Sequence, residues 1–180
     1  MVKEEAGASV NVLQETPSMR NLEDLITGKH SLPLWIVRPI INDKLSCECI
    51  LDPGAQIVVM RKDVWIALGH PRDSKVFILM ESANNSKNQT LGLLKDVKFT
   101  FGPVSLYLQV QVVDSTLFEV LLGCPFFSLL NSLLEDTPDG EVQITLTNPN
   151  TGKSVTIPTM ERVISRKIPE EREHLGKKDF

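Results

Sequence analysis

Residues 49–60 read CILDPGAQIVVM, two apolar runs separated by Asp52, Pro53, Gly54 and Ala55. A carboxylate between two strand-like runs loses hydration unless backbone N–H groups or a second acid satisfy it. Asp-Pro-Gly is also common turn chemistry, so the tripeptide alone favours an ordinary hairpin turn. Because apolar residues follow the tripeptide immediately, the loop is expected between buried strands and not at a polar tip. This context favours a functional acid.

Alternating apolar residues indicate further strands on both sides of this loop. Three hairpins are predicted, namely 34–41 with 45–51, 97–101 with 104–112, and 142–146 with 155–157. Helical spacing is confined to two short segments, 64–68 before Gly69 and 126–134 after Pro125. The sequence therefore predicts a mainly β, antiparallel domain, either a small sandwich or a partly closed barrel.

Composition limits the classes of function. The chain has 180 residues, 42% of them apolar, and a formal net charge of −4. Residues 1–31 are expected to form a flexible linker, 32–160 the folded domain and 161–180 a charged tail. The acidic balance argues against nucleic acid as a partner, and no apolar run approaches the ~18 residues of a membrane span. With no secretory signal pattern, a cytoplasmic, intracellular protein is expected.

The three cysteines and three histidines show no metal-binding pattern. An odd number of cysteines in a chain without a secretory signal favours buried, reduced thiols. The histidines are expected to be exposed to solvent. The sequence therefore predicts no metal site.

An ordered set of segments resembles the retropepsin-like aspartic proteases, in particular those of gypsy-type long-terminal-repeat retroelements of fungi. The resemblance covers about residues 34–134. Its segments are, in order, CILDPGAQIVVM, KDVWIALG, MESANNSKNQTLGLL, FTFGPVSLYLQVQVV and VLLGCPFF. The fold that it implies is a closed or partly open antiparallel β-barrel with one short C-terminal helix.

The resemblance implies an aspartic endopeptidase that processes a retroelement polyprotein without a metal or organic cofactor. Each chain would supply one catalytic Asp52 to a homodimer, and no other aspartate of the chain lies in an Asp-x-Gly triplet. Such an enzyme would work in the cytoplasm or within virus-like particles, on a peptide in extended conformation.

The resemblance also assigns roles to other residues. The loop formed by Pro53, Gly54 and Ala55 would hold the two carboxylates, and Leu121, Leu122 and Gly123 would form the structural motif before the helix. The residues expected to contact substrate are Gln56, Asn84, Asn85, Ser86, Lys87 and Asn88.

The sequence departs from the family pattern at Pro53, where most active members have Ser or Thr. Proline supplies neither the hydroxyl nor the N–H that would bond across the dimer axis. The alternative is therefore an inactive retropepsin-fold module for dimerisation or peptide binding. A more distant alternative is an unrelated β-domain that binds a protein partner. The C-terminal hairpin, 142–157, could form part of the dimer interface or cover the domain's own sheet edge.

Overall fold

The computed structural model describes residues 32–81, 87–137 and 140–162. The expected linker and residues 163–180 of the expected tail lie outside them. Two short helices are present, α1 (Lys62–Leu68) and α2 (Cys124–Leu129). The strands are β1 (Trp35–Val37), β2 (Ile40–Ile41), β3 (Leu45–Ser46), β4 (Cys49–Leu51), β5 (Val58–Arg61), β6 (Leu79–Glu81), β7 (Lys87–Gln89), β8 (Gly92–Phe101), β9 (Val104–Val113), β10 (Val120–Leu122), β11 (Leu133–Asp136), β12 (Val142–Thr147), β13 (Ser154–Pro158) and β14 (Met160–Glu161).

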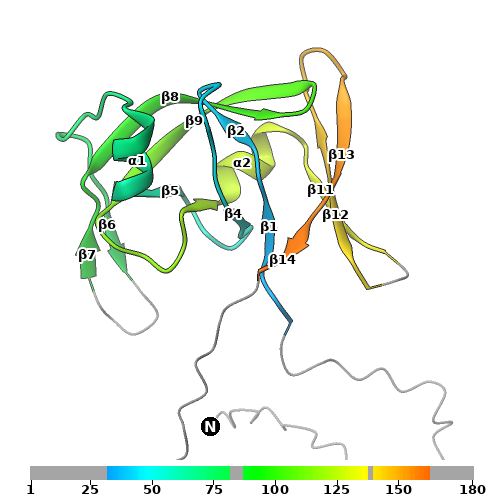
Figure 1. The fold of residues 1–180 in the computed structure, drawn as a ribbon, viewed down its shortest axis with the longest axis horizontal. Coiled ribbons are helices and arrows are strands. Elements are labelled where there is room, and N and C mark those ends of the chain that lie inside the picture. The colour runs from blue at the N-terminus through cyan, green and yellow to red at the C-terminus, as the bar shows by residue number, and fades with distance from the viewer. Residues whose placement is uncertain (1–31, 82–86, 138–139, 163–180) are drawn as a thin grey trace, which may run out of the picture. The chain divides into compact units, whose positions relative to one another are not determined.

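The strands form one large curled sheet and two small sheets (Figure 1). The large sheet has the order β14-β1-β4-β10-β5-β9-β8-β2-β3. The order β11-β12-β13 forms a second sheet, and β6 pairs with β7 in a third. The predicted mainly β architecture, a half-barrel with few short helices, is confirmed.

Strand β10 lies between β4 and β5, the two strands that flank the Asp52 loop. It runs parallel to β4 and antiparallel to β5. Since β4 and β5 pair with β10 and not with each other, the Asp-Pro-Gly segment is not an ordinary hairpin turn. The loop instead connects two strands across the end of a third.

The pairing is mainly antiparallel, as predicted, with two parallel exceptions, β4 with β10 and β5 with β9. Alternation along a strand separates a dry face from a wet one. It carries no information about the direction of a partner that lies far away in sequence. The sheet is therefore mixed.

All three predicted hairpins are present. Asn42 and Asp43 connect β2 to β3 with φ of 49° and 56°, the left-handed pair that a tight hairpin turn needs. Strands β8 and β9 turn at Gly102, whose φ is 54°. Strands β12 and β13 pair from Gln143↔Pro158 to Thr147↔Ser154. Each turn therefore lies where the sequence places it.

Helix α1 ends as predicted, with Gly69 in the left-handed conformation and its N–H bonded to the carbonyl of Trp65. Helix α2 is shorter than the predicted segment 126–134. It ends at Leu129, Asn131 adopts a φ of 42°, and the next residues enter β11. The apolar spacing of Leu133 and Leu134 reflects pairing with β12 and not helix.

The core lies inside the curl of the large sheet. Phe99 and Phe126 are completely buried, and the Phe101 and Phe126 rings are 5.5 Å apart. Trp35 and Trp65 are partly buried against this core. Cys47 and Cys49 are buried, as expected, whereas Cys124 is exposed. The core thus joins β8, β9 and α2 behind the strands that carry the Asp52 loop.

Candidate active site

Asp52 follows the last residue of β4 and is partly exposed. Its own N–H donates to the carbonyl of Leu122 at 3.0 Å, which fixes the start of the loop on β10. The N–H of Gly54 donates to Asp52 Oδ1 at 3.0 Å, and the N–H of Ala55 donates to the Asp52 carbonyl at 3.1 Å. Within the described residues Oδ2 accepts no hydrogen bond, so one carboxylate oxygen is free to act.

The loop rests against Gly123, where the chain leaves β10. A Cβ atom at this position would lie 2.2 Å from the carbonyl oxygen of Ile57 and 2.6 Å from that of Ala55. No side chain fits there, although the φ of Gly123 is an ordinary −92°. The N–H of Cys124 then donates to the Ala55 carbonyl at 2.7 Å. The predicted structural motif thus contacts the acid loop directly.

Arg61 and Lys62, where β5 meets α1, pair with Asp63 and Asp114 and not with Asp52. Arg61 Nε and Asp63 Oδ1 are 2.6 Å apart, and Lys62 Nζ lies 2.8 Å from Asp114. The hydrogen bond from Arg61 lowers the pKa of Asp63. Among the described residues no cation forms an ion pair with Asp52.

A groove of about 640 Å³ runs from this loop to the β6–β7 hairpin; we call it the catalytic groove. Its lining is mostly apolar, as a site for peptide side chains requires. The lining residues are Gly54, Ala55, Gln56, Ile57, Val59, Ile78, Leu79, Met80, Val113, Thr116, Phe118 and Leu121. Asp52 lies two residues before Gly54, the first lining residue along the chain.

The polar hairpin expected to cover the site is present as β6 and β7, which pair from Leu79↔Gln89 to Glu81↔Lys87. Of the residues expected to contact substrate, Gln56 lines the catalytic groove. Lys87 and Asn88 lie in β7, and Asn88 is exposed. The remaining three, Asn84, Asn85 and Ser86, lie outside the described residues.

Sequence reasoning missed the other wall of the catalytic groove, formed by Val113, Thr116 and Phe118. The loop after β9 reaches the site only because β9 and β10 lie on either side of β5. No local pattern shows this placement. Ile78 and Leu79 also line the groove and are 37% and 70% exposed although apolar, and this exposure is visible only in the structure.

The described residues contain no group of three or more side chains suited to hold a metal ion. No described helix has the length and apolar character to span a membrane.

Comparison with known proteins relates the chain to a protein family. The model of the family described as "gag-polyprotein putative aspartyl protease" matches residues 37–129, more than half of the chain. The search of curated proteins returned no match.

Two solved structures are similar to it. The retroviral protease-like domain of Ddi1 from Leishmania major has a TM-score of 0.57 at 13% identity, covering 72% of this chain and 96% of its own. A retropepsin-like aspartic protease from Rickettsia conorii has a TM-score of 0.43 at 17% identity, covering 69% and 85%. The first match shows a shared fold. With the family match over the acid loop, β10 and α2, it follows that the chain belongs to the gag-polyprotein aspartyl protease family and has a retropepsin-like fold.

Proposed function

We propose that the chain is an aspartic endopeptidase that works as a homodimer, with one Asp52 from each copy. The observation that carries the proposal is the carboxylate of Asp52. Among the described residues its Oδ2 accepts no hydrogen bond, while the N–H of Gly54 holds Oδ1, and Gly54 and Ala55 of the same loop line the groove. The chain has only one Asp-x-Gly triplet, whereas the reaction needs two acids. A second copy supplies the other.

The chemistry follows from two carboxylates about 3 Å apart, which hold a single proton between them. The ionised Asp52 takes a proton from a water molecule as that water attacks the peptide carbonyl. The protonated Asp52 of the second copy donates its hydrogen bond to the carbonyl oxygen. In each copy the N–H of Gly54 holds Oδ1 in place, so the reaction needs little rearrangement of the loop.

The catalytic groove and the β6–β7 hairpin suit an extended peptide. Apolar side chains from three parts of the chain line the groove, and Gln56 adds an amide that can both donate and accept. A hairpin over such a groove can add backbone hydrogen bonds to the peptide and exclude water. The match to the gag-polyprotein family supports a polyprotein as the substrate. The gypsy type of the retroelement and an intracellular site of action are part of the proposal and rest on the sequence resemblance alone.

Pro53 supports a second candidate, a dimerising or peptide-binding module without activity. Pro53 is exposed and has no hydroxyl with which to bond across a dimer axis. Its carbonyl accepts a hydrogen bond from Cys124 Sγ at 2.9 Å, so the loop is anchored to its own chain at this residue. If the wild-type chain is inert and Pro53→Thr cleaves peptide, this second candidate is correct.

The test of the first candidate is Asp52→Asn, assayed for peptide cleavage together with circular dichroism. We expect cleavage to be lost and the fold to be retained. Asp136→Asn is the matched control, because Asp136 is exposed in β11 and does not line the catalytic groove. Equal cleavage by Asp52→Asn and the wild type would reject the assignment of Asp52.

A further inference from the structure

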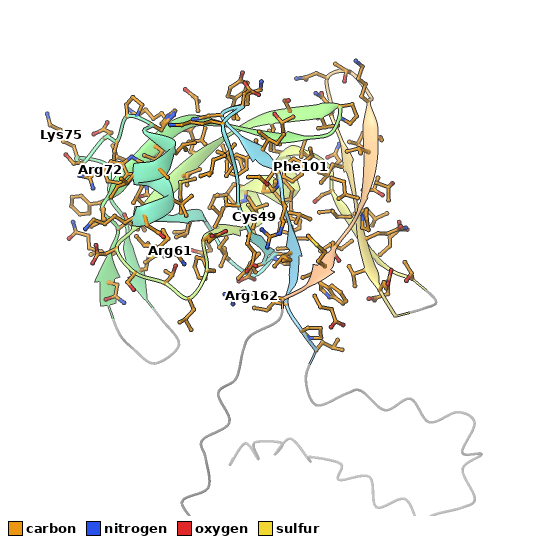
Figure 2. The ribbon with its side chains drawn as sticks, viewed as in Figure 1. Cys49, Arg61, Arg72, Lys75, Phe101 and Arg162 are labelled. Atoms are coloured by element: carbon orange, nitrogen blue, oxygen red, sulfur yellow. The ribbon has the colours of Figure 1, made fainter. Side chains whose placement is uncertain are left out.

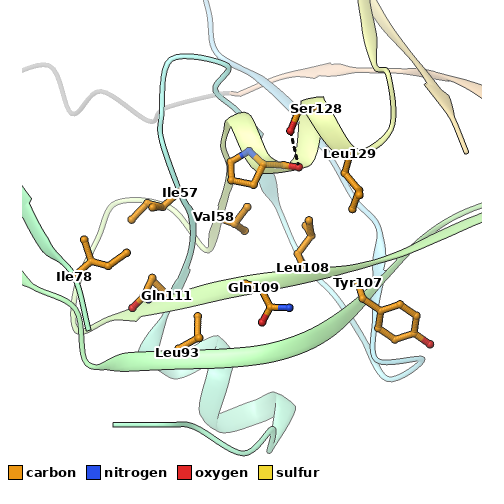
Figure 3. Close-up of a pocket in the computed structure, with 11 residues that line it drawn as sticks. Ile57, Val58, Ile78, Leu93, Tyr107, Leu108, Gln109, Gln111, Ser128 and Leu129 are labelled. Carbon is orange, nitrogen blue, oxygen red and sulfur yellow. Dashed lines mark hydrogen bonds between the residues drawn. The ribbon is translucent and has the colours of Figure 1, made fainter. Parts of the chain in front are cut away.

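A second hollow of about 600 Å³ lies between β9, β5 and α2; we call it the side groove (Figure 3). Its lining residues are Ile57, Val58, Ile78, Leu93, Tyr107, Leu108, Gln109, Gln111, Pro125, Ser128 and Leu129. Ile57 and Ile78 line the catalytic groove as well. The two hollows are therefore neighbours that share these two side chains.

The side groove has apolar walls and one buried amide. Gln111 is 4% exposed, and its Oε1 accepts a hydrogen bond from Thr90 Oγ1 at 2.7 Å. Thr90 Oγ1 in turn accepts the N–H of Ile78 at 2.9 Å. These bonds fix the orientation of the Gln111 amide. They leave its Nε2 donors without an acceptor among the described residues, and since no buried side-chain nitrogen or oxygen of those residues lacks a partner, Nε2 is open to the groove that Gln111 lines.

Gln109, two residues before Gln111, differs because its amide is bonded at both the nitrogen and the oxygen. Gln109 Nε2 donates to Asp96 Oδ1 at 2.7 Å, and Gln109 Oε1 accepts from the N–H of Asp96 at 3.3 Å. Ser128 Oγ reaches the Pro125 carbonyl at 3.4 Å, as the dashed line in Figure 3 marks. The amide of Gln109 is thus held by Asp96 at both ends, whereas both Nε2 hydrogens of Gln111 are without an acceptor among the described residues. The site thus offers a hydrogen bond to a carbonyl beside a surface for an apolar side chain.

We propose that the side groove is an auxiliary peptide-binding site, occupied by a distal part of the same extended substrate that fills the catalytic groove. An apolar side chain of the substrate packs between Leu108 and Leu129, and the Gln111 amide donates to a substrate backbone carbonyl. The choice of occupant rests on continuity, because Ile57 and Ile78 line both grooves and a peptide extended past these two side chains would reach the side groove. The inference rests on the proposed function and extends it to substrate length.

The test compares peptides of two lengths. The short probe has six residues centred on a Phe-Leu bond, and the long probes add three residues ending in Leu, at the N-terminal or the C-terminal end. Matched long probes end in Asp. Binding is measured by fluorescence anisotropy on dimeric Asp52→Asn protein, and cleavage is measured on the wild type.

We expect the Leu extension to lower Kd about tenfold at one end, as burial of one aliphatic side chain can. The Asp extension should give no such gain. On the Asp52→Asn background, Leu129→Asp should abolish the gain, since Leu129 lines the side groove. Leu133→Asp should retain it, because this leucine is also exposed but lies in β11. Gln111→Met, checked for folding by its melting temperature, should reduce the gain.

An equal gain in Leu129→Asp, or no gain at either end, overturns the auxiliary site. If the short probe is cleaved while length has no effect, the proposed protease function stands and only this inference fails. If Asp52→Asn cleaves the short probe as well as the wild type does, the proposed function fails instead.

Discussion

Gly123 controls the position of the acid loop by having no side chain. Its α-hydrogen faces the carbonyl oxygens of Ala55 and Ile57, where a Cβ would lie 2.6 and 2.2 Å away. We expect Gly123→Ala to lower the free energy of unfolding by about 3 kcal/mol or more, because backbone and not a flexible side chain must move. Urea denaturation measures this loss.

Gly140→Ala is the matched control for that variant. Gly140 has a φ of 83°, and a Cβ there would meet no atom within 4 Å. The cost should be about 1–2 kcal/mol, from the left-handed backbone alone. Equal losses in the two variants would show that crowding at Gly123 is not important.

Cys49, labelled in Figure 2, carries a buried thiol whose titration makes the stability of the fold depend on alkaline pH. Burial raises the pKa of the Cys49 thiol well above its ordinary value. The folded protein therefore binds this proton more tightly than the unfolded chain does. Consequently the free energy of unfolding should fall as pH rises above about 8.5, by up to about 1.4 kcal/mol per pH unit.

Cys49→Ala should flatten this alkaline slope, measured by urea denaturation in a phosphine reductant between pH 8 and 10. The comparison uses the slope because removing a buried side chain lowers stability at every pH. Cys124→Ala, which removes an exposed thiol, is the control. A slope unchanged by Cys49→Ala would contradict the prediction.

At the scale of elements, Arg162 ties the end of the described chain to one wall of the catalytic groove (Figure 2). Its N–H donates to the Leu34 carbonyl at 2.8 Å, and its Nε lies 3.0 Å from Glu48 Oε1. Its Nη2 donates to the carbonyl of Leu117, in the loop between β9 and β10. The same loop contributes Thr116 and Phe118 to the catalytic groove.

Arg162→Ala should lower the free energy of unfolding by about 2 kcal/mol, because hydrogen bonds from a partly buried charged group are lost. It should also raise KM for peptides more than it lowers kcat, since the groove wall loses an anchor. Arg38→Ala removes a cation from the same Glu48, but that contact is 3.5 Å long and Arg38 is half exposed. Its effect should be below about 1 kcal/mol.

The elements, the turns and the hairpin partners were largely predictable from the sequence, whereas the strand partners that lie far apart in the sequence were not. The turn at Asn42 and the helix stop at Gly69 depend on local chemistry, and both lie where expected. The position of β10 between β4 and β5 depends on contacts across some seventy residues, which periodicity cannot show. Leu133 and Leu134 were misread as helix because four apolar residues at helical spacing preceded them.

The residues of the candidate site divide in the same way, into those that a local motif predicts and those whose position depends on long-range contacts. The bond from the Gly54 N–H to the Asp52 carboxylate is local and follows from the Asp-x-Gly motif. The packing of Gly123 against this loop is a long-range contact, which only the resemblance to the family indicated. Phe118 and Thr116 could not be assigned to the groove, since their place depends on the crossover. His70 was expected to be exposed, yet both ring nitrogens are bonded, to Asn42 and to the Lys95 carbonyl.

At the scale of the whole molecule, the proposed dimer makes activity depend on how chains pair. Mixing wild-type chains with an equal amount of Asp52→Asn chains should leave about half of the activity per wild-type chain, because random pairing puts half of them with an inactive partner. A ninefold excess should leave about a tenth. Cleavage rates after equilibration of the mixture measure this.

The control mixture uses Asp136→Asn chains, which keep their own Asp52 and should not suppress the wild type. Activity that is independent of the Asp52→Asn excess would show that one chain suffices, and would contradict the shared site.

The insertion of β10 between β4 and β5 also sets an order of events during synthesis. Asp52 leaves the ribosome well before Gly123, and the segment that must brace its loop is still unmade. At a synthesis rate of 5–20 residues per second, Gly123 is made roughly 4 to 14 seconds after Asp52. A newly made chain therefore carries Asp52 before the segment that positions its loop exists, so the proposed protease could not act until the domain is complete.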